Sequence, residues 1–320
     1  MTLSNLIEEK YNTALKNKDL LFYETTKVNK NVDGVEFEIT YAPPLAKKPE
    51  SDIDPTIEEK KKIKVNPFLP PHPALYVQDI GEEHSVILNK FCIVPRHIIV
   101  ITKEFKSQSQ PLFPGDLLAA WKCMMTAFGT TPALAFYNCG PFSGASQPHK
   151  HLQIIPLEGS NPQPPIKALF NQIPERKAGQ IYLLNQLPFV HVIIPLDRNF
   201  IDSSTDDEEL SGYLSQMFFG LLDAMFHQLR KHATPDREIS YNFIMSDQFM
   251  MLIPRSRELA TLSQENLQIS INSLGFAGML LVKTPEELAA LENHNDLMQV
   301  LKDVGYAWNA NADFEDAMEQ

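Results

Sequence analysis

The chain has 320 residues, of which 43% are hydrophobic and 21% charged, the balance of an ordinary globular protein long enough to bury a sizeable core. Its 28 Lys and Arg against 40 Asp and Glu leave a net charge of −12. This charge argues against a broad surface for duplex DNA, because such a surface is basic. A small anionic substrate stays compatible, since a few lysines can make a local positive pocket.

The cysteines and the N-terminal residues indicate the cellular compartment of the protein. The three cysteines, Cys92, Cys123 and Cys139, include no CxxC pair, which favours a reducing compartment. The first residues are polar and amphipathic, without an apolar signal core, and no apolar run approaches ~20 residues. We therefore expect a soluble protein of the cytoplasm, with the nucleus left open, that has neither membrane nor nucleic acid as a partner.

The predicted elements alternate between strands and helices along the chain. An amphipathic helix is expected over 3–15, followed by a loop over 42–73 that holds eight prolines and the run EEKKK. Short β-type runs stand at 85–94, 97–103, 133–138, 151–157, 189–196, 239–246, 249–255 and 278–283. Buried helices are predicted over 116–128, with Asp116 as a cap, and over 210–226. Thr284-Pro285-Glu286-Glu287 begins a further helix, and the tail 309–320 is expected to be poorly ordered.

The order of these elements predicts the fold class. Both halves read strand, strand, helix, strand, strand, and both contain a hydrophobic–Pro–Arg step, at Val94–Arg96 and at Ile253–Arg255. We expect an α+β architecture, an antiparallel sheet with packed helices, in which residues 1–320 form one catalytic unit. The matching halves suggest a degenerate internal duplication.

The segment from Phe136 to Pro156, FYNCGPFSGASQPHKHLQIIP, carries the chemistry. In a strand, alternate side chains share a face. His149, His151 and Gln153 would then line one surface, with Leu152 and Ile154 buried behind it. A His-x-His pair alone is a weak signal; the glutamine at the next alternate position strengthens it.

A turn of small residues precedes this strand. Gly144, Ala145, Ser146 and Gln147 let backbone N–H groups approach an anion closely, and two of them add side-chain donors. An imidazole nitrogen is a competent nucleophile toward phosphorus near neutral pH. The pattern therefore indicates phosphoryl or nucleotidyl transfer.

The run HKHLQII resembles the histidine-triad motif in its transferase form, where glutamine replaces the third histidine. Together with the FYN-x-GP-x-SG-x-S run before it, it is similar to fungal diadenosine tetraphosphate phosphorylases, also called ATP adenylyltransferases. PLAKKPE at 44–50, LNKFCIVPRH at 88–97 and INSLGFAGMLLVK at 271–283 extend the similarity. The resemblance implies a histidine-triad fold like that of galactose-1-phosphate uridylyltransferase.

The resemblance also implies roles for individual residues. His151 would be the covalent nucleophile, and Gln153 would contact the transferred phosphoryl group. His149 either orients His151 by a hydrogen bond or packs beneath it. Substrate binding is expected of Lys48, Asn89, Lys90, Asn138, Gly144, Ala145, Ser146, Gln147, Asn272, Ser273, Leu274, Met279 and Lys283.

The implied reaction is the phosphorolysis of diadenosine tetraphosphate (Ap4A) to ATP and ADP, with inorganic phosphate as the second substrate. No cofactor is required by the sequence, although a divalent cation such as Mg²⁺ could arrive with the substrate. No protein-bound metal is expected, because the two histidines lack a Cys pair or acidic ligand at familiar spacing. Two alternatives stay open, a sugar-nucleotide uridylyltransferase and a nucleotide sensor that binds without turnover.

Overall fold

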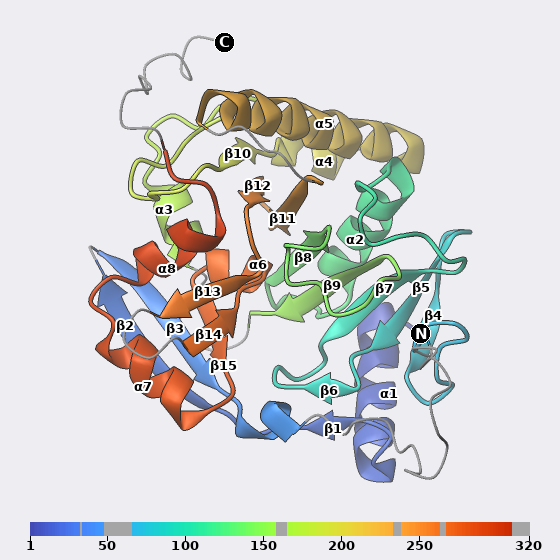
Figure 1. Ribbon diagram of the computed structural model, residues 1–320. Helices are drawn as coiled ribbons and strands as arrows, with labels where there is room; N and C mark the ends of the chain where they lie inside the picture. Colours follow the sequence, from blue (N-terminus) through green and yellow to red (C-terminus); the bar gives the residue numbers. More distant parts are fainter. Residues whose placement is uncertain (33, 48–65, 158–164, 233–237, 263–266, 309–320) are drawn as a thin grey trace.

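The computed structural model describes residues 1–32, 34–47, 66–157, 165–232, 238–262 and 267–308, and its central feature is an eight-stranded sheet (Figure 1). The strands stand in the order β10-β12-β11-β8-β9-β7-β5-β4, and every neighbouring pair is antiparallel. Their bounds are β4 (Tyr76–Ile80), β5 (His84–Leu88), β7 (Ile98–Thr102), β8 (Ala133–Cys139), β9 (His151–Pro156), β10 (Val192–Pro195), β11 (Ser240–Met245) and β12 (Phe249–Arg255). The predicted α+β class with an antiparallel sheet is confirmed.

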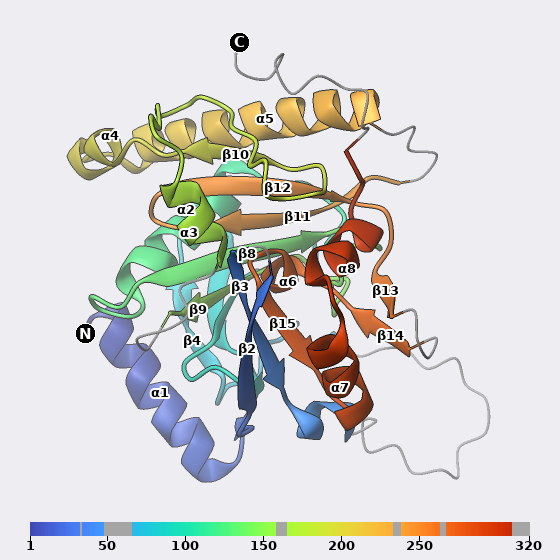
Figure 2. The same ribbon diagram turned by 90° about the vertical axis from the view of Figure 1, so that its left-hand side faces the viewer.

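Three helices cover one face of this sheet, α1 (Leu3–Asn17), α2 (Pro114–Thr126) and α5 (Asp207–His232). Figure 2 shows α1 and α5 lying outside the strands. Alternation along the strands supplies the apolar contacts, because Leu152 and Ile154 of β9 point to this layer. None of the described helices combines the length and the apolar character that crossing a membrane requires.

The opposite face carries a second layer. A three-stranded sheet in the order β15-β3-β2 packs there with four helices. These elements are β2 (Thr26–Val32), β3 (Val35–Tyr41), α3 (Pro165–Asn171), α6 (Ser273–Phe276), β15 (Met279–Val282), α7 (Pro285–Asn293) and α8 (Leu297–Val304). The predicted strand over 278–283 exists, but it pairs in parallel with β3 rather than joining the main sheet. The helix start at Thr284 is confirmed, since its hydroxyl accepts from the Glu287 N–H.

Short elements connect these layers. They are β1 (Leu21–Phe22), the 3₁₀ helix η1 (Pro43–Lys47), β6 (Phe91–Cys92), α4 (Arg198–Ser203), β13 (Leu259–Leu262) and β14 (Leu267–Ser270). Thus the expected loop over 42–73 begins with a helical turn, and its Lys48 and EEKKK run lie outside the described residues, as does the tail 309–320.

Two local predictions were wrong. The run 85–94 is not one strand, because Asn89 turns the chain between β5 and β6 and its side-chain oxygen accepts from the Phe91 N–H. Asp116 is not the N-cap of α2. Phe113 holds that position, and Asp116 caps from within the first turn by accepting the Phe113 N–H at 2.8 Å.

The two halves of the sheet repeat one arrangement. Along the chain β7, α2, β8 and β9 match β10, α5, β11 and β12, and the strand order β8-β9-β7 matches β11-β12-β10. The halves meet where Asn138 pairs with Asn242. The two hydrophobic–Pro–Arg steps are not equivalent, however. Arg96 follows β6, outside the main sheet, whereas Arg255 ends β12.

Candidate active site

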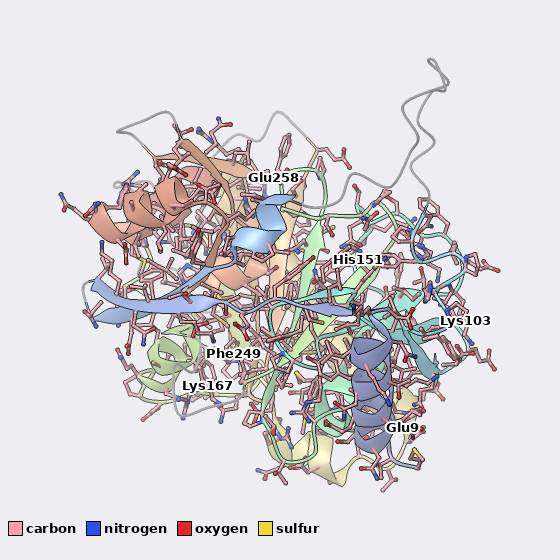
Figure 3. The ribbon with its side chains drawn as sticks, turned by 90° about the horizontal axis from the view of Figure 1, so that it is seen from below. Glu9, Lys103, His151, Lys167, Phe249 and Glu258 are labelled. Carbon is pink, nitrogen blue, oxygen red and sulfur yellow. The ribbon has the colours of Figure 1, made fainter. Side chains whose placement is uncertain are left out.

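His151 begins strand β9 and is buried in the interior (Figure 3). Its Nδ1 lies 2.8 Å from the carbonyl oxygen of His149. A carbonyl only accepts, so Nδ1 carries the proton and Nε2 keeps its lone pair. Burial lowers the pKa of His151 to about 4, so the ring is neutral at pH 7. The geometry therefore leaves the lone pair of Nε2 available, as a nucleophile requires.

His149 is held on both sides of its ring. Its Nε2 donates to the carbonyl and the hydroxyl oxygen of Thr102, each at 2.9 Å. Its Nδ1 accepts from the Asn66 side-chain amide at 3.0 Å. Phe68 contacts both histidine rings, with centroids 5.3 Å from His151 and 5.7 Å from His149. His149 thus orients His151 through its backbone carbonyl, while its ring packs alongside.

The turn before β9 has the backbone that the sequence predicts. Gly144 has φ of +79°, and a Cβ there would lie 2.6 Å from the carbonyl oxygen of Ile271, so only glycine fits. Among the described residues, no atom accepts a hydrogen bond from the backbone N–H groups of Ala145, Ser146 and Gln147. These N–H groups, with the exposed Ser146 side chain, can bind an anion.

Asn138, Asn272 and Ser273 lie together beside this turn. The Oδ1 of Asn138 accepts from the Asn242 side chain at 2.8 Å and from the Ser273 hydroxyl at 2.7 Å. Asn272 caps α6 by accepting the Leu274 N–H. The oxygen of Asn138 is therefore structural, and its amide nitrogen is the group that can meet a ligand.

The buried Arg255 holds the turn before β9 in place through hydrogen bonds. Its guanidinium donates to the carbonyl oxygens of Ser143 and Ile271 at 3.2 and 2.8 Å and to the Asn242 side-chain oxygen. Burial lowers its pKa to about 9. The turn and the start of α6 are thus tied to one side chain.

Gln153 is half-buried and lies beside His97, a residue that sequence reasoning left without a role. The Asn89 amide donates to Nδ1 of His97 at 3.0 Å, so the proton of this ring sits on Nε2. Burial lowers the pKa of His97 to about 4, and contact with Gln153 opposes the shift. Asn89 acts in this structure by orienting His97.

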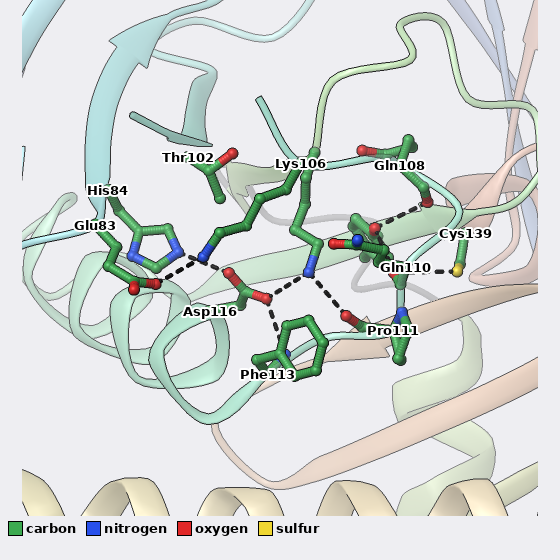
Figure 4. Close-up of polar contacts among 12 residues, drawn as sticks. Glu83, His84, Thr102, Lys106, Gln108, Gln110, Pro111, Phe113, Asp116 and Cys139 are labelled. Carbon is green, nitrogen blue, oxygen red and sulfur yellow. Dashed lines mark hydrogen bonds and ion pairs between the residues drawn. The ribbon is translucent and has the colours of Figure 1, made fainter. Parts of the chain in front are cut away.

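Lys150, between the two histidines, points to the helical face of the sheet. Its Nζ donates to Asp116 at 2.9 Å and to the Pro111 carbonyl at 2.8 Å. The other Asp116 oxygen lies 2.7 Å from Nε2 of His84 (Figure 4). Burial raises the pKa of Asp116, but His84 and Lys150 outweigh it and the net shift is downward. Lys150 therefore anchors β9 to α2.

The other predicted binding residues have different surroundings. Lys90 is exposed at the start of β6, 5.6 Å from the Phe91 ring. Leu274 and Met279 are half-buried against the apolar core of the second layer, and Lys283 follows β15. Nothing in the described structure assigns these four residues a ligand contact.

Three residues near His151 were missed: Phe68, His97 and Gln108. Phe68 lies within the proline-rich loop over 42–73, and Gln108 stands in the irregular segment between β7 and α2. Neither segment has a periodic pattern. His97 ends the motif LNKFCIVPRH, which could have drawn attention to it.

Within the described ranges, no three His, Cys, Asp or Glu side chains converge on one point. Both ring nitrogens of His149 already have partners.

Comparisons with known proteins assign this arrangement to a family. A family model described as the Ap4A phosphorylase N-terminal domain matches residues 1–172, and the ATP adenylyltransferase C-terminal domain matches residues 185–307. Diadenosine 5',5'''-P1,P4-tetraphosphate phosphorylase 2 of Saccharomyces cerevisiae is 32% identical over 312 residues, covering 90% of each chain. Protein APA1 of the same yeast is 28% identical and covers 95% of this chain and 94% of its own length.

Solved structures agree. The crystal structure of yeast Ap4A phosphorylase Apa2 in complex with AMP matches with a TM-score of 0.79 and 28% identity, covering 98% of this chain and 100% of the other. The Apa2 complex with Ap4A gives 0.78 and 27%, covering 96% and 98%. The chain therefore belongs to the Ap4A phosphorylase family.

Proposed function

We propose that this chain cleaves Ap4A with inorganic phosphate and releases ATP and ADP. Nε2 of His151 attacks the α-phosphorus, a P–N bond forms, and the P–O bond to ATP breaks. An oxygen of inorganic phosphate then attacks the same phosphorus, the P–N bond breaks, and ADP leaves. Two in-line displacements at one phosphorus retain its configuration.

One observation carries this proposal, the hydrogen bond from His151 Nδ1 to the His149 carbonyl. It fixes the tautomer in which Nε2 is free. When Nε2 bonds to phosphorus the ring becomes cationic, and the same carbonyl stabilises the charge on Nδ1–H. The N–H groups of Ala145, Ser146 and Gln147, which have no acceptor among the described residues, would stabilise the phosphate oxygens.

The proposal extends to the remaining predicted roles. Lys48, Lys90 and Lys283 would neutralise polyphosphate charge. A divalent cation would enter bound to the substrate, because the described side chains offer no cluster to hold one independently.

The test is incubation with Ap4A, with and without phosphate, followed by identification of the nucleotides. ATP and ADP in equal amounts, formed only with phosphate, are expected. AMP and ATP formed at one rate in both conditions would make the chain a hydrolase. Binding without turnover would make it a sensor, and exchange on a UDP-hexose alone would make it a uridylyltransferase.

A further inference from the structure

The sheet opens beside the nucleophile. Strands β8 and β9 pair from Ala133 opposite Pro156 to Phe136 opposite Gln153, and there the ladder ends. Continued in the same register, it would place Asn138 opposite His151. Instead β8 pairs on with β11, and the chain leaves β8 for the turn at 140–144.

The side-chain amide of Gln108 fills the opening. Its Oε1 accepts the His151 N–H at 2.8 Å, and its Nε2 donates to the Asn138 carbonyl at 2.8 Å and the His151 carbonyl at 3.3 Å. These are the groups that a continued ladder would join directly. The amide therefore replaces the missing ladder bonds and keeps the two strands apart.

The backbone of Gln108 is fixed as well. Its N–H donates to the Pro148 carbonyl at 2.8 Å, and its carbonyl accepts from the Tyr137 hydroxyl at 2.9 Å and from the Gly140 N–H at 3.3 Å. The side chain is buried, and Figure 4 shows Gln108 in the same region as Gln110 and Cys139. Gln108 thus joins the nucleophile strand, the end of β8 and the start of the anion-binding turn.

The second half of the sheet serves as an internal comparison. There the ladder runs unbroken from Ser240 opposite Arg255 to Met245 opposite Met250, and Asn242 pairs directly with Ile253. The opening is thus confined to the half that carries the nucleophile.

We infer that Gln108 is a positioning residue of the nucleotidyl transfer. Its amide holds the His151 backbone away from β8, so that a phosphoryl group can reach Nε2 in line. This inference rests on the proposed function. Both halves of the amide are needed: the oxygen to take the His151 N–H and the nitrogen to donate to the Asn138 carbonyl.

The test compares Gln108→Leu and Gln108→Glu with Gln110→Leu and Gln110→Glu. Gln110 is the matched control, because it lies two residues along the same segment with an exposed side chain. In Gln108→Leu we expect kcat for Ap4A phosphorolysis to fall about 10–100-fold, the cost of a small displacement of a reacting group. KM and the Kd of ADP should change less than about threefold. The Gln110 variants should match wild type.

The glutamate variant tests the donor separately. In Gln108→Glu a protonated carboxyl both accepts and donates, as the glutamine amide does, whereas an ionised carboxylate only accepts. Burial raises the pKa of such a carboxyl above its usual range. The kcat of Gln108→Glu relative to wild type should therefore recover toward low pH and fall as pH rises, which a merely structural role would not produce.

The outcomes separate the two proposals. If the wild-type chain leaves Ap4A intact, the proposed function is wrong. Hydrogen exchange at the His151 amide then still tests whether the Gln108 amide joins the two strands. We expect this exchange to be faster in Gln108→Leu than in Gln110→Leu. Against an active wild type, a folded Gln108→Leu with unchanged kcat overturns the inference. If Gln108→Leu fails to fold, a pH profile of Gln108→Glu parallel to wild type overturns it equally.

Discussion

The Nδ1 of His151 and the carbonyl oxygen of His149 lie 2.8 Å apart, and His191 repeats this geometry with the carbonyl of Phe189 at 2.8 Å. Both histidines are buried, and burial lowers the pKa of each to about 4. They differ at Nε2. In His191 that atom accepts the Leu184 N–H at 2.8 Å, whereas in His151 no described residue bonds to it. One histidine is thus structural, and the other is available for chemistry.

This contrast gives a matched pair of variants. His151→Ala should lower turnover of Ap4A by at least about 10³-fold, as loss of a nucleophile does, with the Kd of ADP nearly unchanged. His191→Ala should lower the melting temperature because the Leu184 N–H loses its partner, and the folded fraction should keep its kcat. Steady-state kinetics, titration of ADP and thermal unfolding measure these effects on turnover, affinity and stability. Substantial activity in His151→Ala would remove its assignment as nucleophile.

The covalent intermediate should accumulate when phosphate is withheld. The adduct forms although Gln153 cannot act as a general acid, because the leaving ATP needs little protonation. Water then attacks the adduct poorly, because an amide cannot activate it. Mass analysis after denaturation at alkaline pH should find AMP on His151, because a phosphoramidate survives base and is lost in acid. Adding phosphate should discharge it as ADP.

Gln153→His should shift the acceptor from phosphate toward water, raising AMP at the expense of ADP. An imidazole at this half-buried position could activate water, which an amide cannot. The ratio of AMP to ADP at fixed phosphate measures the effect. An unchanged ratio would mean that Gln153 does not govern the choice of acceptor.

The buried pair of Lys150 and Asp116 should matter for stability. Lys150→Met leaves Asp116 buried beside His84 without its lysine, and we expect a loss of about 3–5 kcal/mol in the free energy of unfolding. The double variant Lys150→Met with Asp116→Leu should recover part of that loss. Lys106→Met is the control, since its 2.8 Å pair with Glu83 lies at the surface and should contribute less than about 1 kcal/mol. Equal losses in the two single variants would contradict a buried anchor.

Stability should also fall in mild acid. His97, His151 and His191 have pKa values of about 4 in the folded chain, below the 6.5 of an ordinary histidine. The unfolded chain therefore takes up these protons first, and their stabilising effect, complete above pH 6.5, is lost as pH falls toward 4. His191→Gln should reduce the slope of unfolding free energy against pH by up to about 1.4 kcal/mol per unit. The exposed His227 provides the control His227→Gln. An identical slope in both variants would refute the assignment.

The sequence predicted the parts of the site that are local. It placed His151 and Gln153 on one face of a strand, with Leu152 and Ile154 behind it and the glycine turn before it. These features could be predicted because strand alternation and turn formation depend on residues that are close in sequence. Gln108 and Phe68 could not be found this way, since each reaches His151 from an irregular segment that only the folded chain brings near.

The fold, like the site, was predicted in part. Seven of the eight strands of the main sheet were predicted from their apolar runs, and β4 was missed. The hairpin of β2 and β3 was also overlooked. Its outer strand is largely polar, TKVNKNV, so hydrophobic periodicity is weak. The Asp33-Gly34 pair between the two strands was the available signal. Which layer β15 joins depends on contacts with β3 that lie far away in sequence.

The repeated halves have a consequence for stoichiometry. Asn138 faces His151 across the Gln108 amide, whereas Asn242 faces Ile253, and the ladder position of Gln153 is taken in the other half by Arg255. The aliphatic side chain of Ile253 cannot carry a nucleotide. The guanidinium of Arg255 is bonded to the carbonyls of Ser143 and Ile271 and so supports the turn beside His151. The two halves of the sheet are therefore nearly symmetric, but only the first has a histidine at this position. If His151 carries the nucleotide as proposed, labelling should saturate at one AMP per chain.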